Sequence, residues 1–277
     1  EKVSDLAQEL ESLGAKLVLG PGYLENLHED IIFRTPGLSP NTPQLANALE
    51  RGLSISSEME VLFQTCPSHL VAVTGSDGKT TTTTLIAEML KNAGYTVHLG
   101  GNIGKPLLSE AGSMSPDDIA VLELSSFQLM TLSASPDIAV FTNLSPNHLD
   151  IHKSMEEYAL AKENIFSHQG ENDLAIFNRD NDLTHAMVCR APGRVLQFSR
   201  RTSLEEGVFV DNGTIVVAQN GKKRPLFSID RILIPGEHNV ENYLAAIAAE
   251  DKDYASSNML VWFVDEQVEE EESASEM

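Results

Sequence analysis

The residues whose types and spacing best suit chemistry lie between Gly75 and Thr80, in the run TGSDGKT, and we call residues 75–80 the phosphate loop. An apolar run at residues 69–73 precedes them and a helical pattern of apolar residues follows, which predicts a strand, a glycine turn and a helix. The amides of such a turn and the positive end of the helix bind phosphate oxygens. Lys79 would reach the outer phosphates, and the Thr80 hydroxyl would bind the accompanying magnesium ion. The alternative is an ordinary strand-to-helix turn in which Lys79 is solvated.

A second group of polar residues interrupts the apolar run at residues 119–129, where the carboxylate of Glu123 precedes Ser125 and Ser126. In an open α/β sheet, ligands bind beyond the carboxyl ends of the strands, and these side chains would lie there. A buried charge must be paired or bound to a metal ion, and magnesium is the natural partner beside a phosphate loop. The alternative is a structural ion pair between Glu123 and a lysine or arginine.

Two further loops carry polar residues at the ends of predicted strands. The glycines of residues 100–104 permit close approach of the backbone to a ligand, and Asn102 offers both a donor and an acceptor. After the strand expected at residues 138–142, His148 and Asp150 would lie on the same side of the sheet as the phosphate loop. Both loops are therefore candidates for the same site.

A helix is expected after the second of these loops. Ser154 followed by Glu157 is a capping box, which predicts a helix over residues 155–166. This helix carries Lys162 on an amphipathic surface, and from the residues alone this lysine would be solvated.

The remaining elements would position these loops in an α/β fold. The sequence predicts a P-loop-type central domain with a mostly parallel sheet flanked by helices, preceded by a partial Rossmann-like domain. The predicted domains are residues 1–65, residues 66–250 and an atypical acidic tail at residues 251–277. Besides the elements above, strands are predicted at residues 16–19, 31–34, 95–99 and 174–178 and from residue 232. Helices are predicted at residues 3–13, 45–49 and 240–249. A hairpin is predicted over residues 208–217, with its turn at Asn212 and Gly213.

Composition limits the classes of partner. The chain has 277 residues and a formal net charge of −22, which argues against a nucleic acid because both partners would be anionic. No apolar run is long enough to span a bilayer and no signal region opens the chain, so we expect no membrane partner. The two cysteines, Cys66 and Cys189, form no CxxC pair, which indicates free thiols in the cytoplasm. We expect a monomer.

Several motifs together resemble those of the Mur ligases, ATP-dependent enzymes that join an amino acid to a carboxylate. They are TGSDGKT, GNIG, LELSSFQL and TNLSPNHLD followed by SMEEYALAK, with GEHNVEN further on. The SSFQL form resembles the branch of the family that adds D-glutamate. The resemblance implies ATP and Mg²⁺ as cofactors, UDP-MurNAc-L-Ala and D-glutamate as substrates, and amide formation through an acyl phosphate in cytoplasmic peptidoglycan precursor synthesis.

The resemblance also implies roles for single residues, carried over by motif. Catalytic roles fall to Lys79, Glu123, His148 and Lys162, the last with a carbamate on its side chain. ATP would be bound by Gly75, Ser76, Asp77, Gly78, Lys79, Thr80, Thr81, His238, Asn239 and Asn242. The UDP-linked substrate would be bound by Thr35, Asn102, Ser125 and His148, and the magnesium ions by Thr80, Glu123, His148 and Lys162.

Alternatives remain for some of these roles and for the whole chain. Asn239 would equally serve as a helix N-cap, and residues 33–40 around Thr35 would equally form a plain Pro-Gly turn. The resemblance covers roughly residues 15–249, so we expect the front of the family's first domain and all of its third domain to be missing. The alternative function is therefore a truncated, catalytically inactive relative that binds nucleotide, and a further one is an unrelated phosphate-loop ATPase.

Overall fold

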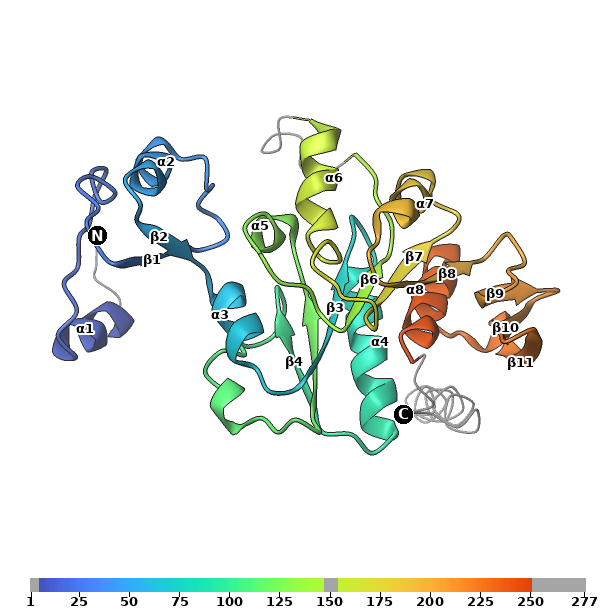
Figure 1. Ribbon diagram of the computed structural model, residues 1–277. Coiled ribbons are helices and arrows are strands. Elements are labelled where there is room, and N and C mark those ends of the chain that lie inside the picture. The colour runs from blue at the N-terminus through green and yellow to red at the C-terminus, as the bar shows by residue number, and fades with distance from the viewer. Residues whose placement is uncertain (1–4, 147–153, 251–277) are drawn as a thin grey trace. The chain divides into compact units, whose positions relative to one another are not determined.

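The structure, a computed structural model, describes residues 5–146 and 154–250 (Figure 1). The chain forms two compact units, Glu1–Ser56 and Ser57–Met277, and each is described by itself. The units divide before helix α3 (Glu58–Thr65), whereas the boundary predicted from the sequence lies after residue 65. The predicted acidic tail and His148 lie outside the described residues.

The first unit is small and contains a two-stranded parallel sheet. Its elements in order are α1 (Asp5–Ser12), β1 (Ile31–Phe33), α2 (Pro43–Glu50) and β2 (Ser54–Ser56), and β1 pairs with β2. Pro43 opens α2, which contains the helix predicted at residues 45–49, and Leu45 and Ala48 of this helix are buried. The strand predicted at residues 16–19 is wrong. Its apolar residues Val18 and Leu19 are exposed, and no described strand pairs with them.

The second unit is built on a nine-stranded sheet with the order β11-β10-β9-β8-β7-β6-β3-β5-β4. The strands from β4 to β9 run parallel, and β10 and β11 add an antiparallel edge. This confirms the predicted mostly parallel α/β sheet. The strands are β3 (His69–Thr74), β4 (Val97–Gly101), β5 (Ile119–Glu123), β6 (Ile138–Phe141), β7 (Leu174–Asn178), β8 (Arg194–Ser199), β9 (Gly207–Asp211), β10 (Thr214–Gln219) and β11 (Lys222–Ser228).

Helices cover both faces of this sheet. They are α3 (Glu58–Thr65), α4 (Lys79–Asn92), α5 (Ser126–Leu129), α6 (Met155–Glu163), α7 (Asp182–Met187) and α8 (Glu237–Ala248), with short 3₁₀ turns at Ala111–Ser113, Val188–Arg190 and Ile229–Arg231. No helix in the described residues is long and apolar enough to cross a membrane.

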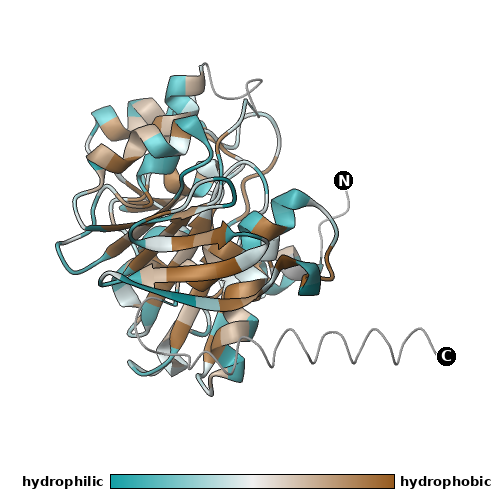
Figure 2. Cartoon of the chain, turned by 90° about the vertical axis from the view of Figure 1, so that its right-hand side faces the viewer, coloured by the Kyte–Doolittle hydropathy of each residue, from teal (hydrophilic) through white to brown (hydrophobic). Residues whose placement is uncertain are grey.

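The two faces carry separate hydrophobic cores because side chains alternate along a strand. Val71 and Val73 of β3 face one core with α4 and α8, while Leu70 and Ala72 face the other with α3 and α6. The central parallel strands β3, β5, β6 and β7 are therefore apolar on both sides, because each has residues in both cores. Figure 2 shows much of the sheet in brown, the colour of hydrophobic residues. The continuous apolar runs of the sequence arise from this double burial.

Several predicted elements differ from the structure near their ends, among them the helix predicted over residues 155–166, which ends at Glu163. The apolar run at residues 119–129 is β5 followed by the short helix α5, because Ser125 caps that helix. The strand predicted from residue 232 is irregular, and α8 begins at Glu237, with Gly236 and not Asn239 as its N-cap. The strand predicted at 95–99 runs instead over Val97–Gly101.

Two Asn-Gly turns form the antiparallel edge. Asn212 and Gly213 have φ values of 48° and 75° and join β9 to β10, which confirms the predicted hairpin. Asn220 and Gly221, with φ values of 53° and 73°, join β10 to β11 in the same way. This second Asn-Gly pair is a hairpin signal of the same kind in the sequence.

Candidate functional site

The phosphate loop joins β3 to α4, as predicted, and its two glycines are required by close contacts. Gly75 has φ 153° and Gly78 has φ 77°, a conformation that favours glycine. A Cβ atom on Gly75 would lie 2.0 Å from Oγ1 of Thr142, and one on Gly78 would lie 2.2 Å from Oδ1 of Asn242. Side chains from α8 and from the segment after β6 thus touch the loop backbone at these two points.

Polar side chains after β6 hold the loop from one side. The Oγ1 atom of Thr142 donates a hydrogen bond to the carbonyl oxygen of Asp77 at 2.7 Å. Asn143 accepts from the Asp77 amide at 3.0 Å and donates to the Asp77 carbonyl at 2.9 Å. The hydroxyl of Ser76 accepts from the amide of Ser145 at 2.9 Å. The exposed Asp77 therefore lies on a loop whose backbone is fixed by its neighbours.

Lys79 and Thr80, at the start of α4, have different partners. The Nζ atom of Lys79 donates to the carbonyl oxygen of Ser76 at 2.8 Å, so this lysine folds back over the loop. Thr80 lies in the first turn of α4, and its hydroxyl donates to Oε2 of Glu123 at 2.7 Å. Thr81 is half-buried in the same turn. The alternative of a Lys79 that is only solvated is not what the structure shows.

Glu123 ends β5 beside the loop and is 2% exposed. Besides Thr80, its carboxylate accepts a hydrogen bond from Nδ2 of Asn102 at 2.8 Å. Among the described residues no lysine or arginine forms an ion pair with it, so the structural ion pair considered from the sequence is wrong. A buried carboxylate next to a hydroxyl is a set of oxygen donors that fits a magnesium ion.

Lys162 is 1% exposed, which corrects the expectation that it is solvated. Its Nζ atom donates to the carbonyl oxygen of Gly75 at 2.8 Å and to Oγ1 of Thr74 at 3.2 Å, and lies 4.9 Å from the ring centre of Tyr158. Tyr158 and Lys162 are four residues apart, so α6 presents both on one face.

The environment of Lys162 changes its protonation. Burial lowers the pKa of Lys162 from 10.5 to about 7, and the charge of Lys79 acts in the same direction. The carboxylates of Glu123 and Asp77 oppose this change in pKa. A substantial fraction of the amine is therefore neutral at neutral pH, and a neutral amine is a nucleophile.

Asn242, supported by Asn239, is the residue that the start of α8 brings to the phosphate loop. Asn242 is buried, and its Oδ1 accepts from the hydroxyl of Thr82 on α4 at 3.3 Å. Its Nδ2 donates to Oδ1 of Asn239 at 3.0 Å, and Asn239 donates to the carbonyl of Pro235 at 2.8 Å. His238 is exposed. The structure thus brings Asn242 to the phosphate loop, and Asn239 supports it.

Two predicted substrate residues have structural partners of their own. The hydroxyl of Ser125 accepts from the amide of Gln128 at 3.3 Å, and the Gln128 side chain accepts from the Ser125 amide at 3.0 Å, which forms a capping box for α5. Thr35 is exposed in the first unit. Nη1 of Arg34 donates to the carbonyls of Thr35 and Leu38, at 3.2 and 2.7 Å, and so shapes the turn after β1.

The sequence analysis missed Thr142 and Tyr158 as supports of the loop. The hydroxyl of Tyr158 lies 3.3 Å from that of Ser76, and burial raises the pKa of Tyr158. A signal for Thr142 exists, because the residue that follows a buried parallel strand next to β3 must lie at the same edge of the sheet. No local signal marks Tyr158.

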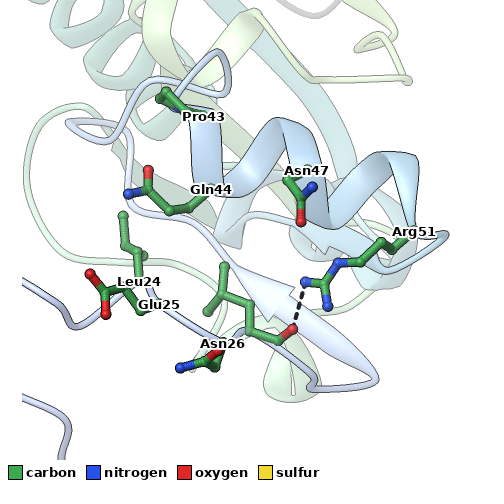
Figure 3. A pocket seen from close by; sticks show the side chains of 8 residues that line it. Leu24, Glu25, Asn26, Pro43, Gln44, Asn47 and Arg51 are labelled. Carbon is green, nitrogen blue, oxygen red and sulfur yellow. Dashed lines mark hydrogen bonds between the residues drawn. The ribbon is translucent and has the colours of Figure 1, made fainter.

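Two pockets in the described residues lie away from the phosphate loop. In the first unit, a hollow of about 420 Å³ is lined by α2 and the segment before β1, and Arg51 donates to the carbonyl of Leu27 at 2.6 Å across it (Figure 3). Another, of about 570 Å³, lies beside α5 and α6 and includes Leu160 and Glu163. Neither contains a residue predicted for the site.

Comparisons with a family model and with curated relatives indicate the same family. Residues 73–250 match the family model described as the Mur ligase middle domain. The chain is similar to the UDP-N-acetylmuramoylalanine--D-glutamate ligase of Ruminiclostridium cellulolyticum, with 50% identity over 250 residues, which are 90% of this chain and 54% of the relative. It is also similar to the enzyme of the same name from Acetivibrio thermocellus, with 50% identity over 249 residues, which are 90% of this chain and 53% of the relative. The chain spans about half the length of the curated relatives it matches.

Solved structures agree with this family at the level of the fold. A UDP-N-acetylmuramoyl-L-alanyl-D-glutamate--2,6-diaminopimelate ligase matches with a TM-score of 0.61 at 20% identity, over 90% of this chain and 66% of that one. A UDP-N-acetylmuramate:L-alanyl-gamma-D-glutamyl-meso-diaminopimelate ligase from Neisseria meningitides matches with a TM-score of 0.58 at 19% identity, over 93% and 86%.

Proposed function

This chain belongs to the Mur ligase family, and from that premise we propose that it carries the ATP site of a ligase that joins D-glutamate to UDP-MurNAc-L-Ala. The names of the relatives at 50% identity support the substrate pair. The observation that carries the proposal is the arrangement of Lys79, Thr80 and Glu123 around a glycine turn at the carboxyl edge of the sheet. Residues 1–65 would serve the UDP-linked substrate, and residues 66–250 would bind ATP.

The phosphate loop would bind the ATP phosphates. Its amides and the N-terminus of α4 attract phosphate oxygens, and Lys79 would leave the Ser76 carbonyl to neutralise the outer phosphates. Thr80 and Glu123 would hold a magnesium ion, which supplies charge neutralisation for phosphoryl transfer when bound. His238, Asn239 and Asn242 would lie on the nucleoside side.

The reaction proceeds in two steps in this proposal. The carboxylate of UDP-MurNAc-L-Ala attacks the γ-phosphorus of ATP, which gives an acyl phosphate and ADP. The amine of D-glutamate then attacks the acyl carbon, and phosphate leaves as the amide forms. Such chemistry relies on positioning and charge neutralisation more than on a protein nucleophile, and Asn102, Ser125 and His148 would position the acyl substrate.

Lys162 would act as a carbamate. Its lowered pKa, about 7, supports this role because a neutral amine attacks carbon dioxide and releases one proton as the N–C bond forms. The resulting carboxylate would help His148 to hold a second magnesium ion. The enzyme would act in the cytoplasm as a monomer, and the free thiols Cys66 and Cys189 are consistent with a reducing compartment.

Phosphate release tests the proposal directly. The 277-residue chain is mixed with ATP, Mg²⁺ and UDP-MurNAc-L-Ala, with and without D-glutamate, and Lys79→Ala is the matched blank. Release that requires D-glutamate and is lost in the blank is the expected result. Nucleotide binding without such release would instead support the alternative of a nucleotide-binding relative that ligates nothing.

A further inference from the structure

Two separate supports hold the phosphate loop, and they come from different parts of the sheet. The first is Thr142, after β6, whose hydroxyl donates to the Asp77 carbonyl and touches Gly75. The second is Asn242 of α8, which touches Gly78 and accepts from Thr82. A shift of α8 relative to the end of β6 would change the contacts on the two glycines relative to each other.

Asn178, at the end of β7, joins these two supports. Its Nδ2 donates to the carbonyl of Thr142 at 2.9 Å and to Oε2 of Glu241 at 3.1 Å, which uses both amide hydrogens. Its Oδ1 accepts from the amide of Asp180 at 2.9 Å, so the orientation of the side-chain amide is determined. Asn178 is buried, and Glu241 is the residue before Asn242 on α8.

Arg200 completes the connection from the next strand. It follows β8, and its guanidinium lies 3.5 Å from Oε1 of Glu241 and 2.8 Å from Oε2 of Glu237. Its own backbone is fixed, because its amide donates to Oδ2 of Asp180 at 2.7 Å. The side chain of Arg200 is 19% exposed and that of Glu241 is 22% exposed, so water screens this ion pair only in part. The side chain of Glu237 is 79% exposed, so its ion pair with Arg200 contributes little to stability.

We propose that Arg200 is a positioning residue for nucleotide phosphates: through Glu241 and Asn178 it keeps α8 and the end of β6 in register around the phosphate loop. Figure 1 shows α8 lying beside β8, and α8 also packs against α4, the helix that the loop opens. The inference rests on the proposed function, in that ATP is the ligand of the loop, and it adds Arg200, which no sequence motif indicated.

The test compares three single variants of the full chain. Arg200→Ala removes the guanidinium, Arg200→Lys keeps a charge, and Arg201→Ala is the matched control because that neighbouring side chain is exposed. Glu241→Gln removes the other charge of the pair and is combined with Arg200→Ala. Affinities for ATP and for AMP are measured by calorimetry in the presence of Mg²⁺, and melting temperature is followed in parallel.

We expect Arg200→Ala to weaken ATP binding roughly 10-fold and AMP binding less than about 2-fold, because the loop holds the outer phosphates. Arg200→Lys restores part of the loss, and Arg201→Ala changes neither affinity. The double variant with Glu241→Gln is no weaker than Arg200→Ala alone, since both act through one connection. Equal losses for ATP and AMP would mean direct contact with the nucleoside and would overturn the inference.

Hydrogen exchange without nucleotide separates this inference from the proposed function. In Arg200→Ala the amides of residues 74–82 should exchange several-fold faster than in the parent chain, while those of α3, in the same unit, stay unchanged. Unchanged exchange at residues 74–82 would overturn the positioning role. If the parent chain binds no ATP, the proposed function is contradicted. The comparison of hydrogen exchange between Arg200→Ala and the parent chain would still decide whether Arg200 holds the loop.

Discussion

The Nζ atom of Lys162 lies 2.8 Å from the carbonyl oxygen of Gly75, although the two residues are 87 positions apart. This contact joins α6 to the first glycine of the phosphate loop. Since the lysine is buried there beside Lys79, its proton is held less tightly than in water. A chemically ordinary side chain thus becomes a titrating group next to the site.

The lowered pKa of Lys162 predicts a pH-dependent stability. Between pH 7 and the unfolded pKa of 10.5 the unfolded state binds more protons than the folded state, so the free energy of unfolding rises with pH. Lys162→Met should remove this rise, which is at most about 1.4 kcal/mol per pH unit. Urea denaturation at a series of pH values in bicarbonate-free buffer measures it. Exposed Lys105→Met is the control. If the free energy of unfolding changes with pH in the same way in Lys162→Met and in the parent chain, the lowered pKa of Lys162 is contradicted.

The contact between Gly78 and Asn242 predicts a large cost for a single methyl group. Gly78→Ala and Gly213→Ala carry the same backbone strain, since the φ values are 77° and 75°, but only Gly78 has a neighbour at the Cβ position. Gly213→Ala should destabilise the chain by about 1–2 kcal/mol and Gly78→Ala by roughly 2 kcal/mol more. Chemical denaturation of both variants measures the difference. Equal destabilisation would show that Asn242 does not constrain the loop.

Glu123→Gln should separate stability from metal binding. The buried carboxylate has hydrogen-bond donors but no cation among its described partners, so its neutral analogue should leave the melting temperature unchanged or raise it. The increase in ATP affinity caused by Mg²⁺ should fall by about 10-fold, because a charged ligand is lost. ATP titrations with and without Mg²⁺ measure this, and exposed Glu205→Gln serves as control. If Mg²⁺ increases the ATP affinity of Glu123→Gln as much as that of the parent chain, Glu123 is not a ligand of the metal ion.

Ser125→Ala should destabilise the chain by about 1 kcal/mol through the loss of the α5 cap. Asparagine is also a good N-cap, so Ser125→Asn should recover most of this loss. Thermal unfolding of the two variants measures the effect. If Ser125→Ala is as stable as the parent chain, the capping box has no role in stability.

The sequence predicted the phosphate loop well because every signal there is local. The strand, the glycines, Lys79 and the helix are adjacent in the chain, and each constrains the next. Glu123 was placed correctly for a similar reason, since its position at a strand end fixes the edge of the sheet where it lies. Family resemblance then pointed to Lys162, which no local pattern marks, and its role is a proposal.

The parts that sequence reasoning missed depend on contacts between distant residues. Burial of Lys162 requires the packing of α6 against the end of β3, which no spacing within α6 reveals. Residues 16–19 have strand-forming side chains but no neighbouring strand among the described residues. Arg200 precedes its partner Glu241 by 41 positions, so only the folded sheet brings the two together.

Titration of the chain with MgATP tests the central claim, that residues 75–80 bind nucleotide phosphates. The account predicts a saturable isotherm for the parent chain and an affinity at least about 10-fold weaker, ~1.4 kcal/mol, for Lys79→Ala. The exposed control Lys105→Met should bind as the parent does. Equal affinities for the parent chain and Lys79→Ala, or no binding to either, would contradict it.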